Sequence, residues 1–252
     1  MQKYPDNSID LVLSDPPFKV SQFYGGGVDA DNLINVASIL RTFPEVSRVL
    51  KKGRFAVFFY DNRILPFLFE AVKGTELMYK KSIYLYRRWG AAHKWMGWMQ
   101  CTDPICFFTK GSEKPFMPKL KGKIKHDCYT KAGPEKDNTG HPAQKPIEVI
   151  KDIISWCSDE DEIILDPYAG SGTVCLAAKL LNRKYIGIEI IKEYVDLSLN
   201  RLKTINNLSD FLPIKTPIAL IPSNSGADNM TNTVDDVVDV DDAEFTNKEG
   251  ST

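Results

Sequence analysis

The chain has 252 residues and a formal net charge of −1, with 43% hydrophobic and 26% charged residues, which is typical of a soluble globular protein with one sizeable core. No apolar run reaches the length of a membrane span and no signal peptide precedes the first predicted strand, so we expect no membrane contact. The five cysteines are odd in number and form no C-x-x-C pair, which argues against a disulfide framework and favours a cytoplasmic setting.

The charge is unevenly distributed. Eight acids against one lysine give residues 223–252 a charge of −7, which leaves +6 for residues 1–222. Residues 80–125 carry eleven Lys and Arg against two acids. Such a basic body suits a polyanionic partner, although a solvated lysine-rich loop explains the charge as well. We expect the acidic end of the chain, from about residue 223, to be disordered.

The first predicted strand covers residues 9–13 (IDLVL) and runs into Ser14-Asp15-Pro16-Pro17-Phe18. The two prolines end the strand and form a rigid elbow, since neither can donate a backbone hydrogen bond. Asp15 and the Pro16 carbonyl can accept two hydrogen bonds from one exocyclic amino group, and Phe18 can stack on its ring. The alternative is an ordinary turn with Phe18 in the core.

The following segments alternate between helical and strand patterns. Three glycines at 25–27 indicate a loop, and Lys51-Lys52-Gly53 indicates the end of a helix. The expected elements up to residue 86 are helical turns over 31–50 with a new helix from Pro44, a strand over 55–60, a helix over 66–72 and a strand over 83–86.

Residues 87–140 are the least regular part of the sequence. A core strand is expected at 105–108, and residues 110–138 are rich in Lys, Gly and Pro without a period. The tryptophans at 89, 95 and 98 suit either core packing or base stacking. A helix is expected over 146–156. The three histidines are too scattered to indicate a metal site.

A second informative stretch begins with the apolar strand at 163–166, which runs into the loop Pro167–Thr173. A helix over 174–181, a strand over 185–189 and a closing helix over 192–203 follow. Gly170 and Gly172 permit close backbone approach at a helix N-terminus, and an acid about 20 residues past such a loop often binds ribose hydroxyls. Glu189 stands near that spacing, so a nucleoside-containing ligand is favoured over an ordinary βαβ unit.

Four motifs in this order resemble the β-type amino-group DNA methyltransferases, in which the catalytic half precedes the cofactor half. The motifs are Asp15–Phe18, His141–Pro146, Asp166–Thr173 and Ile186–Glu189. The resemblance covers roughly residues 8–203. It implies an α/β fold, the class I methyltransferase (Rossmann-like) sheet in circularly permuted order, flanked by helices. The implied organisation is a methyltransferase domain at 1–205 with a basic target-recognition region at about 87–140, an extension at 206–222 and the acidic tail at 223–252.

The resemblance implies transfer of a methyl group from S-adenosylmethionine to the exocyclic amino group of a flipped base in double-stranded DNA. Adenine N6 is favoured because the elbow begins with Asp, whereas Ser is more usual in cytosine enzymes. The implied catalytic residues are Asp15, Pro16, Pro17 and Phe18. The implied cofactor-binding residues are Lys145, Asp166, Tyr168, Gly170, Gly172, Thr173 and Glu189, with Asp166 facing the cofactor's ammonium and Glu189 its ribose. The implied DNA contacts are Lys19, Arg87, Arg88 and Lys94, and no metal is needed.

Three alternatives stay open. A cytosine N4 methyltransferase would keep the mechanism. A catalytically impaired DNA-binding relative would follow from the short segment before Ile9, where the family usually has another strand. A nucleotide-dependent oxidoreductase is disfavoured by the missing third glycine. A bacterial or phage-infected host cell is the expected setting, and a homodimer and a restriction partner are left open.

Overall fold

The computed structural model describes residues 1, 3–16, 40–93, 98–111, 116, 125–131 and 144–206. Its strands are β1 (Ile9–Ser14), β2 (Leu50–Phe59), β3 (Leu77–His93), β4 (Trp98–Lys110), β5 (Cys128–Lys131), β6 (Ile163–Asp166) and β7 (Lys184–Gly187). Its α-helices are α2 (Phe43–Val49), α3 (Leu65–Val72), α4 (Ile147–Cys157), α5 (Thr173–Leu180) and α6 (Lys192–Asn206), and a 3-10 turn covers Asn62–Ile64.

The seven strands form one sheet in the order β5-β3-β4-β2-β1-β6-β7. The strands β2, β1, β6 and β7 are parallel neighbours, whereas β4 runs antiparallel between β2 and β3. From β1 the chain passes to β2 on one side, and from β6 it passes to β7 on the other. The boundary between β1 and β6 is therefore the point where the winding direction reverses, and ligands bind at such points in open α/β sheets.

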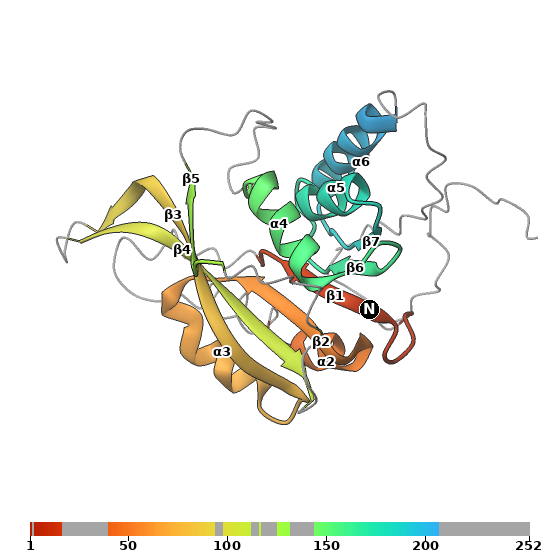
Figure 1. The fold of residues 1–252 in the computed structure, drawn as a ribbon, viewed down its shortest axis with the longest axis horizontal. Coiled ribbons are helices and arrows are strands. Elements are labelled where there is room, and N and C mark those ends of the chain that lie inside the picture. Colours follow the sequence, from red (N-terminus) through yellow and green to blue (C-terminus); the bar gives the residue numbers. More distant parts are fainter. Residues whose placement is uncertain are drawn as a thin grey trace, which may run out of the picture.

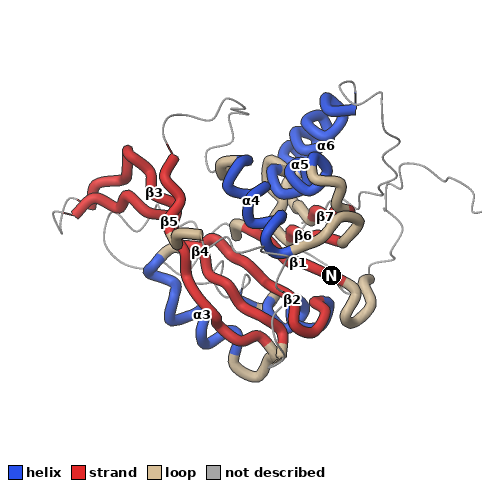
Figure 2. Tube along the Cα trace, in the orientation of Figure 1, coloured by secondary structure: helices blue, strands red, loops and turns tan. Residues whose placement is uncertain are grey.

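Helices cover both faces of the sheet, as Figures 1 and 2 show. Buried side chains of α2 and α3 join one core with Val12 and Phe58, and those of α4, α5 and α6 join a second core on the other face with Leu11 and Val57. In α4 the buried residues recur with helical spacing, which directs one apolar stripe onto the sheet. The predicted α/β sheet flanked by helices is confirmed.

Two local features differ in detail from the expectation. The helix α2 ends at Val49, directly before the stop signal at 51–53, and the three residues of that signal already belong to β2. Gly53, with φ of 72°, instead lies where the register between β1 and β2 shifts, from Ile9 opposite Leu50 to Leu11 opposite Phe55. The region from residue 87 begins as a strand, because β3 continues to His93 and pairs with β4 as far as Trp98, with a register shift between Tyr86 and Ala91. The expected glycine loop at 25–27 and helical turns at 31–39 lie outside the described residues.

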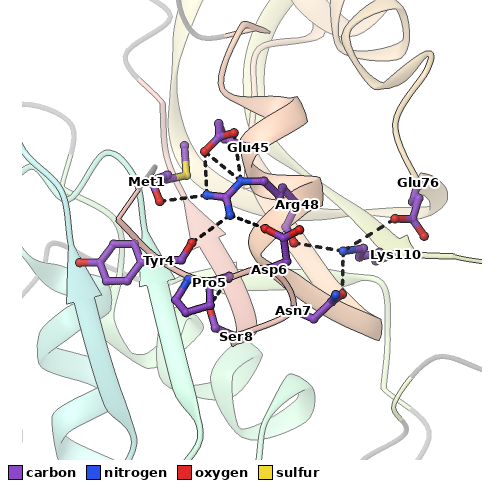
Figure 3. A network of polar contacts seen from close by, with 10 residues as sticks. All are labelled: Met1, Tyr4, Pro5, Asp6, Asn7, Ser8, Glu45, Arg48, Glu76 and Lys110. Carbon is purple, nitrogen blue, oxygen red and sulfur yellow. Dashed lines mark hydrogen bonds and ion pairs between the residues drawn. The ribbon is translucent and has the colours of Figure 1, made fainter.

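The N-terminal segment is held against α2 and β4 by a polar network (Figure 3). Arg48 donates to the carbonyls of Met1 and Tyr4 and forms ion pairs with Asp6 and Glu45. The buried Lys110 ammonium donates to Asn7 Oδ1 at 2.8 Å and to the Arg48 carbonyl at 3.2 Å. The segment is thereby fixed before it enters β1.

The short strand β5 is joined to helix α4 by side chains. Tyr129 donates to Asp152 Oδ2 at 2.5 Å, and the Lys125 ammonium pairs with the same carboxylate and lies 4.3 Å from the centre of the Trp156 ring. Burial is the largest cause that raises the pKa of the Tyr129 hydroxyl. This contact positions the end of the predicted recognition region against the core.

Candidate active site

Three acids lie at the carboxyl ends of adjacent parallel strands, on either side of the reversal point. Asp15 follows β1, Asp166 ends β6, and Glu189 follows β7. The sequence predicted each acid on a separate motif, and the sheet order makes their strands neighbours. Burial is the largest cause that raises the pKa of Asp166, and the charges of Asp15 and Glu189 raise it further, so both lie close enough to act on Asp166.

The elbow carboxylate has a cationic partner. Lys145 Nζ lies 2.5 Å from Asp15 Oδ2, and the side chains are 14% and 29% exposed. The same ammonium lies 5.2 Å from the centre of the Phe59 ring. Lys145 was expected among the cofactor-binding residues, whereas the structure places it on the elbow aspartate. This contact spans 130 positions of sequence, so no local pattern could indicate it.

Asp166 is buried, and within the described residues its carboxyl group accepts two hydrogen bonds, both on one oxygen. Ser14 Oγ donates to Asp166 Oδ1 at 2.5 Å, and the Tyr168 backbone N–H donates to the same oxygen at 3.1 Å. Burial raises the pKa of Asp166 to about 7, although both hydrogen bonds act to lower it. A buried carboxyl with a raised pKa is a site that a cationic group would stabilise.

Glu189 holds the glycine loop. Its Oε2 accepts the Gly170 N–H at 2.7 Å, and its Oε1 accepts the N–H groups of Ile190 and Ile191 at 2.8 and 2.9 Å. A carboxylate offers about four acceptor positions, so Oε2 keeps one for a further donor. Glu189 can therefore receive one ribose hydroxyl while it keeps these backbone contacts.

Gly172 is needed for packing against α6. Its φ is 75°, and a Cβ at this position would lie 2.8 Å from the Cβ of Ser198. Ser198 in turn donates to the Gly170 carbonyl at 2.8 Å, and Arg201 donates to the Ser171 carbonyl and to Thr173 Oγ1. Thr173, predicted at the cofactor, is buried in this contact between α5 and α6.

Sequence reasoning missed Ser14, Ser198 and Arg201. Ser14 stands directly before the elbow, and its hydroxyl at a buried strand end was the one available signal. The two α6 residues lie one helical turn apart, three positions from each other, and nothing in the sequence links them to the glycine loop.

Tyr168 was predicted at the cofactor. Burial raises the pKa of its hydroxyl, which donates to Thr42 at 3.5 Å.

For the remaining predicted residues the structure gives less detail. Pro16 is buried and lies two residues beyond the end of β1. Arg87 and Arg88 fall on β3, where only their backbone is described. The predicted residues outside the described part of the chain are Pro17, Phe18, Lys19 and Lys94.

Two further properties bear on the class of protein. Across the residues that the structure describes, no group of three His, Cys, Asp or Glu side chains could hold a metal ion. No helix in this part of the chain is long and apolar enough to cross a membrane.

The profile of the DNA methylase family, the N6/N4 methyltransferases, matches residues 9–200. This chain belongs to that family. The type II methyltransferase M.HpaI of Haemophilus parainfluenzae is 28% identical to it over 221 residues, which cover 80% of this chain and 70% of that protein. The DNA adenine methyltransferase YhdJ of Escherichia coli (strain K12) is 27% identical over 241 residues, which cover 83% of this chain and 81% of that protein.

Solved structures show the same fold. The crystal structure of the M1.HpyAVI–SAM complex aligns with a TM-score of 0.61 and 24% identity over 80% of this chain and 90% of that one. The cytosine-N4-specific PvuII DNA methyltransferase aligns with a TM-score of 0.66 and 20% identity over 82% of this chain and 86% of that one. The chain therefore has the class I methyltransferase fold. The family match identifies it as a DNA methyltransferase, and that family uses S-adenosylmethionine.

Proposed function

We propose that this methyltransferase acts on adenine N6, with the elbow at Asp15 as its catalytic centre and the ends of β6 and β7 as its cofactor site. The observation that carries this placement of the two sites is the hydrogen bond from Ser14 to Asp166, at 2.5 Å. It joins the strand that carries the elbow to the strand that begins the glycine loop. The catalytic and cofactor motifs, 152 positions apart, are thus adjacent in space.

Asp15 receives the amino group of the base. Because Lys145 occupies Oδ2, the other carboxylate oxygen is left to accept a hydrogen bond from the base, and the Pro16 carbonyl accepts a second. As the amino nitrogen takes the methyl group from a sulfonium sulfur, which would keep the electron pair of the broken carbon–sulfur bond, the nitrogen would gain positive charge and then release a proton. A fixed carboxylate stabilises that charge. Lys145 keeps Asp15 in one orientation while the base enters. Flipping the base out of the duplex costs a few kcal/mol.

The residues at the ends of β6 and β7 fit S-adenosylmethionine, which supplies an electrophilic methyl group when it is bound. Asp166 offers a buried carboxyl whose pKa is raised to about 7, chiefly by burial and further by the charges of Asp15 and Glu189. In this proposal Asp166 holds the ammonium group of the cofactor. Glu189 keeps one acceptor position for a ribose hydroxyl beside the Gly170 N–H. Tyr168, Gly170, Gly172 and Thr173 build the loop between them.

Adenine is favoured over cytosine for two reasons. The elbow begins with Asp15, and the relative YhdJ is an adenine methyltransferase by name. The fold does not discriminate, because a cytosine-N4-specific enzyme shares it. The basic residues at 80–125 suit the phosphate backbone of DNA, which gives affinity without sequence preference.

The test is to identify the methylated base. The protein is incubated with unmethylated DNA and S-adenosylmethionine that carries an isotopically labelled methyl group, and the digested nucleosides are identified by mass. Label on N6-methyladenine that is lost in Asp15→Ala supports the proposal. Label on N4-methylcytosine overturns the base assignment, and label that persists in Asp15→Ala overturns the role of the elbow.

A further inference from the structure

Ser14 is a polar residue in a fully buried position. It is the last residue of β1, directly before Asp15, and its side chain is 0% exposed. Its Oγ donates to Asp166 Oδ1 at 2.5 Å, a short distance that is typical of a hydrogen bond to an ionised acceptor. A buried hydroxyl of this kind needs a partner, and Asp166 on the neighbouring strand provides it.

This contact determines which oxygen of Asp166 is available. Oδ1 has two acceptor positions, and the hydroxyl of Ser14 and the N–H of Tyr168 occupy both. Oδ2 receives no hydrogen bond from the part of the chain that the structure describes. The two donors together restrict the rotation of the carboxyl group, and Oδ2 is the oxygen that is left for a ligand.

Ser14 also favours the charged form of Asp166. Burial, Asp15 and Glu189 all raise the pKa of this carboxyl, and only the Ser14 hydroxyl and the Tyr168 N–H lower it. The Lys145 ammonium is paired with Asp15. The Cys175 thiol also lies near Asp166, whose charge helps burial to raise the pKa of that thiol.

We propose that Ser14 is a positioning residue for cofactor binding, which holds the Asp166 carboxyl group turned so that Oδ2 receives the ammonium group of S-adenosylmethionine. This inference rests on the proposed role of Asp166 in holding the cofactor. It adds a residue that belongs to none of the predicted sites, and it makes the strand that carries the elbow part of the cofactor site. Ser14 acts through Asp166 and touches no reacting atom.

The experiment measures Asp166 and the ligand separately. The Asp166 carboxyl is titrated by ¹³C NMR in the ligand-free protein, and the Kd of S-adenosylhomocysteine, which carries the same ammonium, is measured between pH 5.5 and 7.5. In this range an α-ammonium stays largely protonated. The variants are Ser14→Ala, Ser14→Cys and Ser14→Thr. Cys is close to Ser in size but a weak donor, and Thr keeps the hydroxyl. The matched control is Ser8→Ala. The Ser8 hydroxyl donates to the Pro5 carbonyl in an exposed hydrogen bond.

In Ser14→Ala and Ser14→Cys we expect the midpoint of Asp166 to rise by about one pH unit, because a hydrogen bond to a charged group is lost. Affinity for S-adenosylhomocysteine should fall about tenfold at pH 6 and less at pH 7.5. Ser14→Thr and Ser8→Ala should stay within about twofold of the unmodified protein. Ser14→Cys, which preserves packing, decides the matter if Ser14→Ala fails to fold.

An unchanged midpoint and Kd in a folded Ser14→Cys protein would overturn the inference, as would equal losses in Ser14→Thr. Neither measurement needs DNA or methyl transfer. A protein that binds S-adenosylhomocysteine in this Ser14-dependent way but methylates no DNA would contradict the proposed function alone. Methyl transfer with a Ser14-independent Kd would contradict this inference alone, and absence of ligand binding would overturn the cofactor site itself.

Discussion

Replacing Asp166 by Asn should change the free energy of unfolding of the ligand-free protein in a pH-dependent way. The variant should be more stable, compared with the unmodified protein, at pH 8 than at pH 5. The unfolded chain releases this proton near the ordinary pKa of 3.8, whereas the native protein holds it until about pH 7. Between pH 5 and 7 the native state therefore binds more protons than the unfolded state, so the contribution of Asp166 to stability is lost as pH rises. Two pH units at about 1.4 kcal/mol each amount to ~2.7 kcal/mol.

Asn keeps the local geometry, because its Oδ1 can accept the hydrogen bonds from Ser14 and Tyr168. It carries no charge, so the pH-dependent cost disappears. The free energy of unfolding of Asp166→Asn, minus that of the unmodified protein, should rise by about 2–3 kcal/mol from pH 5 to pH 8. The same variant should lose affinity for S-adenosylmethionine, because the ammonium has lost its counter-charge.

Urea unfolding of the ligand-free proteins at pH 5, 6, 7 and 8 measures this difference. The control is Asp196→Asn, at a carboxylate 56% exposed on α6, whose difference from the unmodified protein should stay flat. A flat difference for Asp166→Asn as well would refute the reasoning, because it would mean that Asp166 is ionised in the native state across the whole range.

Three more variants test other parts of the account. Gly172→Ala should cost about 2–4 kcal/mol of unfolding free energy, because the new Cβ meets Ser198; Gly74→Ala has nearly the same φ and nothing within 4 Å, so chemical denaturation should show only about 1 kcal/mol there, and equal costs would remove the steric argument. Lys145→Met should lower kcat about tenfold or more with cofactor Kd unchanged, and Lys145→Arg should recover part of it; a weaker Kd with normal kcat would return this residue to the cofactor site. Arg48→Met should speed hydrogen exchange at the amides of the N-terminal segment, and unchanged protection would show that the network of Figure 3 does not hold it.

Local sequence patterns predicted the parts of the site that lie next to one another in the chain. The elbow after β1 follows from two prolines, which cannot continue a strand. The loop after β6 and the acid after β7 follow from apolar runs, glycines and spacing. These patterns, with the order of the motifs, were sufficient for the fold and the family.

The contacts that turn these motifs into one site could not be predicted in this way. The partners Ser14–Asp166 and Asp15–Lys145 are 152 and 130 positions apart, and only the strand order brings them together. Gly172 was interpreted as room for a ligand, whereas Ser198 occupies the space beside it. The full hairpin of β3 and β4 was missed because residues 87–100 mix basic residues with glycines, alanines and tryptophans and show no apolar alternation.

The most direct test of the central claim is single-turnover methyl transfer by the unmodified protein and by Asp15→Ala at saturating S-adenosylmethionine, with cofactor affinity measured on the same samples. If the elbow holds the amino group while the ends of β6 and β7 hold the cofactor, Asp15→Ala should transfer methyl groups at least about 100-fold more slowly, with cofactor affinity within about twofold. A normal rate in Asp15→Ala, or a lost rate that follows entirely from lost cofactor affinity, would contradict the account.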